Sequence, residues 1–123
     1  MIKWSEDVRK NDPDIFLKQD IEDKVATDVP IWILADARRM TDVKYFQSQQ
    51  FDSVSRHFIR IEVDEDIRKR RGYVFTLGVD DVESECGLDK FTGWTLTIRN
   101  NDLTDEEIIN LFKPILDECA KYY

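Results

Sequence analysis

The hydrophobic positions near the N-terminus recur at helical spacing. We expect a helix over about residues 1–10 and a second over about residues 12–23. Asp12 can accept hydrogen bonds from the free backbone N–H groups of the first turn of that second helix. Pro13 suits the first helical position, because an N–H at that position would have no partner inside the helix.

Three later segments have the pattern of strands. Residues 30–35 form a continuous apolar run, which is typical of a strand buried on both faces of a parallel sheet. Residues 56–63 and 94–98 are expected to form two further strands, and residues 74–91 an irregular acidic stretch with one short helix. Helices alternate with these strands, so the pattern predicts an α/β layered fold in a single domain over residues 1–123.

The remaining helices are marked by their ends. Residues 41–50 and 64–71 are expected to be helical, the second ending at Gly72, a common helix cap. Thr104 and Glu107 have the spacing of a capping box and predict the start of a final helix. Its buried stripe is expected to contain Ile108, Ile109, Leu111, Phe112, Ile115 and Leu116.

Composition narrows the classes of function. The 123 residues include 18 basic and 26 acidic side chains, and the net charge of −8 excludes a general nucleic-acid binder. The longest apolar run is too short to span a bilayer, and acids stand where a signal peptide would be apolar. We therefore expect a soluble intracellular protein with neither a nucleic-acid nor a membrane partner.

Cysteine, histidine and glycine exclude several site types. Cys86, Cys119 and His57 match no zinc-ligand spacing, and we expect free buried thiols and a half-buried strand histidine. All four glycines lie after residue 71, and the chain contains neither Gly-x-x-x-x-Gly-Lys-Ser/Thr nor Gly-x-Gly-x-x-Gly. Any phosphate must be bound without a glycine-rich loop from these residues.

Arginine and asparagine side chains gather where the expected strands end. Ligands of open parallel sheets bind at the carboxyl ends of the strands. Adjacent guanidinium groups repel each other unless an anion lies between them, and each matches phosphate oxygens with two hydrogen bonds. The pattern predicts a site for a polyphosphate or a phosphorylated substrate, at Arg38, Arg39, Arg60, Arg68, Arg71, Arg99, Asn100 and Asn101.

Each of these features also has a structural interpretation. Arg38 and Arg39 could pair with neighbouring acids in a solvated loop. Asp36 has the position of a Walker-B acid that holds magnesium, but an acid at a strand end is more often a cap. Residues 68–71 could be the positive end of a solvated helix or, followed by Gly72, part of a mobile phosphate lid.

Three segments resemble the animal-type phosphomevalonate kinases: residues 1–4 (Met-Ile-Lys-Trp), residues 30–42 and residues 71–89. The resemblance extends from residue 1 to about residue 100. It implies a P-loop fold like that of the nucleoside-monophosphate kinases. It further implies transfer of the γ-phosphoryl group of ATP, with Mg²⁺, to 5-phosphomevalonate. The product would be 5-diphosphomevalonate, in isoprenoid and sterol synthesis.

The same resemblance implies the site residues and the setting. It assigns Arg38 and Arg39 to catalysis and acceptor binding, Arg9, Arg60, Arg68 and Asn100 to substrate binding, Arg71 and Asn101 to ATP, and Asp36 to the metal. Asn101 departs from the family pattern, which has a histidine near ATP at this position. The resemblance also implies a monomer in the full-length form, located in the cytosol, with the peroxisome as the alternative.

The family begins with a strand and a P-loop that carries a phosphate-binding lysine. By resemblance, that strand lies in the sheet between residues 30–36 and 56–63. The 123 residues contain neither, so we expect this chain alone to be marginally folded and inactive as a kinase, as an incomplete sequence or as a fragment complemented by another chain.

Two other functions remain open. One is a non-catalytic phosphate-ligand-binding or regulatory protein derived from that kinase. The other is an acidic globular domain whose arginines are surface charge.

Overall fold

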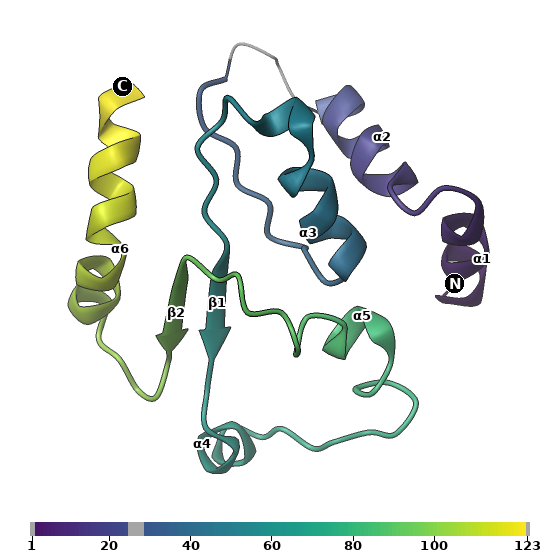
Figure 1. Cartoon of the computed structure of the whole chain (residues 1–123). Helices are drawn as coiled ribbons and strands as arrows, with labels where there is room; N and C mark the ends of the chain where they lie inside the picture. The colour runs from purple at the N-terminus through teal and green to yellow at the C-terminus, as the bar shows by residue number, and fades with distance from the viewer. Residues whose placement is uncertain (1, 25–28, 123) are drawn as a thin grey trace. The chain divides into compact units, whose positions relative to one another are not determined.

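The computed structural model describes residues 2–24 and 29–122, and the chain divides into two compact units, Met1–Val54 and Ser55–Tyr123. Each unit is considered by itself (Figure 1). None of the described helices is long and apolar enough to cross a lipid bilayer. Along the chain the elements are α1 (Ile2–Asn11), α2 (Ile15–Lys24), α3 (Met40–Gln47), η1 (Gln49–Phe51), β1 (Ile59–Glu62), α4 (Glu65–Arg70), α5 (Glu83–Cys86), β2 (Leu96–Arg99), α6 (Asp105–Cys119) and η2 (Ala120–Tyr122).

The three helices expected in the N-terminal unit are confirmed as α1, α2 and α3. The helix start expected at Asp12 and Pro13 was placed too early, because α2 begins at Ile15 and both residues lie before it. Asp12 organises the turn before α2, where its Oδ1 accepts the Asp14 N–H at 3.2 Å and the Lys18 ammonium at 3.1 Å. Leu17 of α2 and Val43 of α3 are the buried apolar side chains described in this unit. An aromatic cluster of Tyr45, Phe46 and Phe51 packs at the end of α3, with ring centroids 5.1–5.5 Å apart.

The strand expected at residues 30–35 is not present, and this prediction was wrong. The segment carries no regular secondary structure, and the side chain of Ile33 is 90% exposed. A strand needs a neighbour to receive its backbone hydrogen bonds. Within the described residues the sheet contains β1 and β2 alone, so the apolar run has no strand to pair with.

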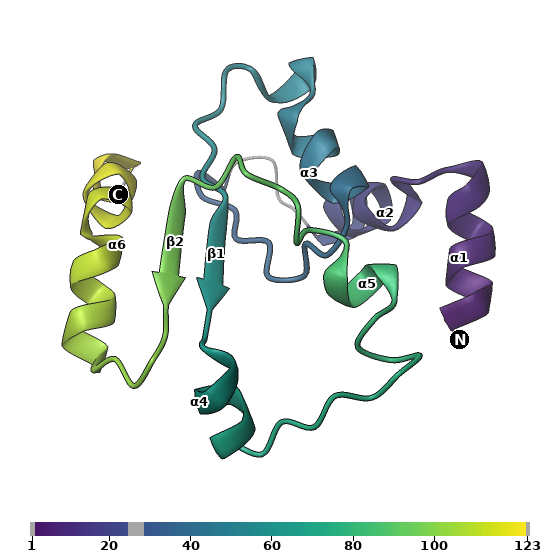
Figure 2. The same cartoon turned by 60° about the horizontal axis from the view of Figure 1, so that its bottom comes forward.

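The C-terminal unit is built on two parallel strands, as the sequence predicts. β1 and β2 pair from Ile59 opposite Leu96 to Glu62 opposite Arg99, and they lie side by side with the same direction in Figure 2. They are shorter than the expected segments 56–63 and 94–98. Coverage of the sheet is uneven, because Ile98 is 3% exposed and Ile61 is 66% exposed.

The connection between the strands contains the expected helices α4 and α5. α4 is followed by Gly72, whose φ of +97° is the left-handed conformation that glycine adopts easily at a helix end. In the next loop, Asp80 Oδ2 accepts the Thr76 N–H at 2.6 Å, and Asp81 Oδ1 accepts the Gly78 N–H at 2.5 Å. These acids therefore stabilise a turn.

The capping box of α6 is confirmed, with the Glu107 N–H 3.2 Å from Thr104 Oγ1 and the Thr104 N–H 2.7 Å from Glu107 Oε2. The apolar stripe of α6 that was expected to be buried is narrower in the structure than predicted. Ile108, Phe112 and Ile115 are half-buried, but the remaining expected positions are exposed, at Ile109, Leu111 and Leu116. A two-stranded sheet offers too little surface to cover the full stripe.

A polar contact joins the end of α6 to the segment before β1. His57 Nε2 lies 2.7 Å from Glu118 Oε2, and His57 is half-buried, as expected. The pKa of Glu118 is lowered, chiefly by hydrogen bonding from Ser55 and next by that from His57. Cys86 and Cys119 are free, but they are half-buried and not fully buried as expected.

Replacing the capping residue tests how α6 begins. Thr104→Ala removes the side-chain acceptor of the Glu107 N–H and should lower the free energy of unfolding by about 1 kcal/mol. Thr104→Ser keeps a hydroxyl and should stay near wild type. Urea denaturation monitored by circular dichroism measures both. Equal stability of the alanine and serine variants would contradict this account.

The contact at Glu118 predicts a pH dependence. A carboxylate whose pKa is lower in the folded state adds stability at pH values above its unfolded pKa, and this contribution is lost as the pH falls through the folded pKa. Glu118→Gln should therefore destabilise the chain at pH 7 and lose its difference from wild type well below pH 4. Thermal unfolding at both pH values measures this, and a difference that persists in acid would overturn it.

Candidate functional site

Two of the arginines implied by the sequence converge on one carboxylate in the N-terminal unit. The guanidinium of Arg39 is buried, with 7% of the residue exposed, and its Nη2 donates to Glu6 Oε1. Arg9 Nη1 lies 3.8 Å from the same oxygen. The Arg9 guanidinium also stacks on the Phe16 ring, 4.5 Å from its centroid. The two arginines thus meet although α1 and α3 are far apart in sequence.

Arg39 has a donor that is not used in the structure. Its Nε is buried and has no hydrogen-bond partner. A buried N–H of a charged group without an acceptor is unfavourable, so this atom favours an additional acceptor close by.

Arg38 and Arg39 are oriented through their backbone. Asp42 Oδ2 accepts both of their backbone N–H groups at 2.9 Å, and this fixes the start of α3. The Arg38 side chain is exposed. The structure therefore supports part of the structural interpretation of this loop. Asp42 does organise it, through hydrogen bonds from the backbone N–H groups of Arg38 and Arg39.

Asp36, the residue assigned to magnesium, belongs to no cluster of metal-ligating side chains within the described residues. Asp36 is exposed in the irregular segment before α3. The described residues contain no group of three or more His, Cys, Asp or Glu side chains that could hold a metal. Mg²⁺ is often held by one carboxylate together with substrate phosphates and water, and Asp36 fits only this kind of site.

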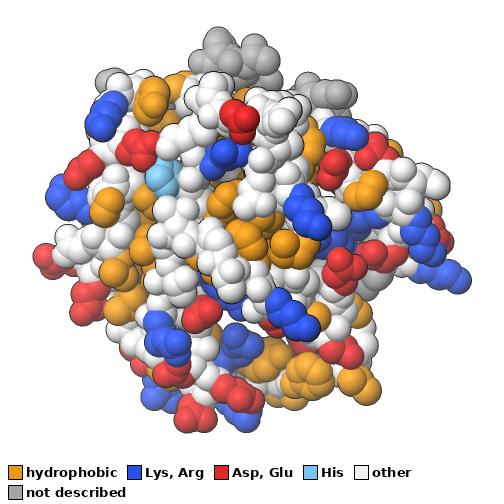
Figure 3. All heavy atoms as spheres, in the orientation of Figure 1, with side chains coloured by type: hydrophobic (Ala, Val, Ile, Leu, Met, Phe, Trp, Pro, Cys, Tyr) orange, Lys and Arg blue, Asp and Glu red, His pale blue; other side chains and the backbone are white. Residues whose placement is uncertain are grey.

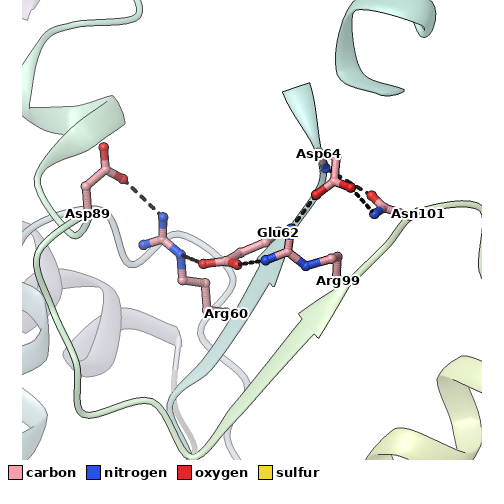
Figure 4. Close-up of polar contacts among 6 residues, drawn as sticks. All are labelled: Arg60, Glu62, Asp64, Asp89, Arg99 and Asn101. Atoms are coloured by element: carbon pink, nitrogen blue, oxygen red, sulfur yellow. Dashed lines mark hydrogen bonds and ion pairs between the residues drawn. The ribbon is translucent and has the colours of Figure 1, made fainter. Parts of the chain in front are cut away.

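A second polar cluster lies at the carboxyl ends of β1 and β2 (Figure 4). Arg60 donates from Nε to Glu62 at 2.9 Å and from Nη2 to Asp89 at 3.1 Å. Its Nη1 donates to the Leu88 carbonyl at 3.1 Å, and the guanidinium lies 5.5 Å from the ring centre of Trp94. Arg60 is thus held on several sides.

The other half of this cluster centres on Asp64. Arg99 donates to Asp64 and lies 3.5 Å from Glu62 Oε2. Asn101 accepts the Asp64 N–H at 3.0 Å and donates to Asp64 Oδ2 at 2.8 Å. Asn101 therefore ties the turn after β2 to the end of β1. The Asn100 backbone N–H extends the strand pairing by donating to the Glu62 carbonyl at 2.7 Å.

The basic end of α4 is paired with the turn after β2. Arg70 and Arg71 donate to the two carboxylate oxygens of Asp102 at 2.6 and 3.1 Å. The pKa of Asp102 is lowered, chiefly by the hydrogen bond from Arg71. Asp102 has a φ of +63°, an uncommon conformation for a residue other than glycine. Arg68 stacks over Tyr73, 5.1 Å from its ring centroid.

The structure distributes the implied residues over the two units. Arg9, Asp36, Arg38 and Arg39 belong to the N-terminal unit, and the remainder belong to the C-terminal unit: Arg60, Arg68, Arg71, Asn100 and Asn101. Acidic and basic side chains are interspersed over the face shown in Figure 3. An anion that binds Arg39, Arg60 or Arg71 must compete with a carboxylate of the protein.

Sequence reasoning missed these acidic partners. Glu6, Glu62, Asp64, Asp89 and Asp102 were not identified as members of the site. The opposed charges of Glu62 and Arg99 could have been found, because both stand near the ends of the two expected parallel strands. The spacing of Glu6 and Arg9, three residues apart on one helix, is also a local signal. The contacts of Glu6 with Arg39 and of Asp89 with Arg60 arise through tertiary packing, which leaves no local signal in the sequence.

Comparison with known proteins shows which proteins this chain is similar to. The family model described as phosphomevalonate kinase matches residues 1–53, which is nearly the whole N-terminal unit. The phosphomevalonate kinase of Drosophila melanogaster is 31% identical over 125 residues, covering 100% of this chain. The chain spans 64% of the length of that relative. The resemblance of residues 1–4, 30–42 and 71–89 is confirmed in this way, and the whole length of this chain is similar to a phosphomevalonate kinase.

Proposed function

We propose that this chain contributes the arginines that bind substrate and ATP in a phosphomevalonate kinase. The proposed reaction transfers the γ-phosphoryl group of ATP to 5-phosphomevalonate and yields 5-diphosphomevalonate. The observation that carries the proposal is the convergence of Arg9 and Arg39 on Glu6. The chain that contains them is similar, along all of its own 123 residues, to part of a phosphomevalonate kinase.

The chemistry of phosphoryl transfer suits such a site. Both reactants are anions, so they approach each other only where positive side chains offset their repulsion. Catalysis of this class depends mainly on positioning and on stabilising charge, and it needs no dedicated base. In this proposal Arg38 and Arg39 bind the acceptor and neutralise charge at the transferred group. Arg9, Arg60, Arg68 and Asn100 orient the acceptor, and Arg71 and Asn101 face ATP.

Magnesium is part of the proposal. When bound, Mg²⁺ would neutralise charge on the phosphate oxygens of ATP. Asp36 would supply one carboxylate ligand, and its exposure leaves it accessible to a metal that also binds phosphates.

The proposed fold is that of the P-loop nucleoside-monophosphate kinases. The parallel pairing of β1 and β2 supports it, because parallel strands are characteristic of this class of α/β fold.

One observation favours a second candidate, a phosphate-ligand-binding or regulatory protein without catalysis. These residues contain no glycine-rich phosphate loop. Separate titrations with 5-phosphomevalonate and ATP discriminate between the candidates, because a binding protein derived from the kinase should prefer the acceptor.

Arg38 provides a direct test of acceptor binding. Arg38→Lys keeps the charge but loses the planar fork, and it should weaken binding of 5-phosphomevalonate roughly tenfold in titration calorimetry. Arg56→Lys is the matched control, since it makes the same change at a residue outside the proposed site, and it should bind as wild type does. Equal affinity of the two variants would favour the interpretation of Arg38 as surface charge.

Turnover tests the catalytic part separately. We expect the purified 123-residue chain to bind 5-phosphomevalonate but to release no ADP that depends on it, because phosphoryl transfer in this fold uses a P-loop lysine that these residues do not contain. A coupled ADP assay with both substrates and Mg²⁺ measures this. Robust turnover would refute the expectation and would show that these residues suffice for catalysis.

A further inference from the structure

We propose that Glu6 is an internal competitor for the phosphate site, occupying the position between Arg9 and Arg39 that a phosphate group of the ligand takes when it binds. This inference rests on the proposed function for the identity of the natural ligand. The competition itself concerns any phosphate anion.

The geometry of the three residues supports competition. One oxygen of Glu6 accepts a hydrogen bond from Arg39 and lies 3.8 Å from an Arg9 nitrogen, so two guanidinium groups pair with the charge of one carboxylate. Arg39 Nε, which is buried and unpaired, adds a donor beside it. A carboxylate has two oxygens, whereas a phosphate monoester offers three acceptor oxygens around one centre and can serve more of these donors.

The charges point in the same direction. Two guanidinium groups and one carboxylate leave this cluster with an excess of one positive charge. A phosphate dianion that replaced the carboxylate would balance both arginines. Asp42, which also contacts Arg39, accepts two backbone N–H groups with its Oδ2.

Accessibility shows how the exchange can occur. The Glu6 side chain is 37% exposed, that of Arg9 is 23% exposed and that of Arg39 is 9% exposed. Glu6 is therefore the member that can rotate into solvent without unpacking the cluster. Arg39 would remain buried, and Arg9 would remain stacked on Phe16.

The test compares two charge-neutralising variants on the same helix. Glu6→Gln removes the competing charge and keeps the shape of the side chain. Asp7→Asn is the matched control, because it raises the net charge by the same amount but removes a partner of exposed Lys10 only. The probes are inorganic phosphate and 5-phosphomevalonate, each titrated into the full 123-residue chain and followed by NMR of the arginine Nε–Hε groups.

We expect Glu6→Gln to bind inorganic phosphate roughly tenfold more tightly than wild type, with the Arg39 Nε–Hε signal shifting on binding. Asp7→Asn should stay within about twofold of wild type, as expected for an exposed charge that pairs with Lys10 instead of with the two arginines. An unchanged or weaker affinity in Glu6→Gln, or an equal gain in both variants, would overturn the proposal.

Two further results keep the test decisive. If Glu6→Gln fails to fold, Glu6→Asp retracts the carboxylate by one methylene, and it should also bind phosphate more tightly. No gain in that variant counts against the competition.

The two probes also separate this inference from the proposed function. If Glu6→Gln gains affinity for phosphate but neither the wild type nor the variants prefer 5-phosphomevalonate to phosphate, the competition stands and the proposed substrate fails. If Glu6→Gln gains no affinity for phosphate but the chain prefers 5-phosphomevalonate to phosphate, the proposed substrate stands and the competition fails.

Discussion

The parallel pairing of β1 and β2 is the interaction on which the C-terminal unit depends. Four residues on each strand are in register, and this register places Glu62 opposite Arg99 at the carboxyl ends. Because parallel strands end at the same edge, the turns after both strands bring Asp64 and Asn101 together. The positions of Arg60 and Arg99 follow from this short ladder, and so does the polar cluster around them.

Much of this arrangement could be predicted from the sequence, because local signals determine it. Thr104 and Gly72 mark helix ends through their own capping chemistry, and both do so in the structure. The strands at β1 and β2 were also expected. Residues 30–35 were not predicted correctly, because an apolar run indicates where a strand can form, whereas a strand forms only with a partner.

The candidate site shows the same division between local and tertiary information. Guanidinium groups at strand and helix ends could be recognised from their positions along the chain. Their pairing with Glu6, Asp89 and Asp102 could not, because these contacts join residues distant in sequence. A buried arginine such as Arg39 requires a counter-charge, and the chain supplies one with its own carboxylate. Charge neutrality in the folded chain and affinity for an anion are thus opposed at these positions.

Cleavage of the loop between α4 and α5 would separate the two paired strands covalently. Between Gly72 and Gly78, both at positive φ, the side chains of Val74, Phe75 and Leu77 are exposed. Exposed loops of this kind are preferred sites of proteolytic cleavage. The covalent connection from β1 to β2 passes through this loop, so a single cut would turn their pairing into an association between two separate peptides. A ladder of four residues would then lose the high effective concentration that the intact chain provides.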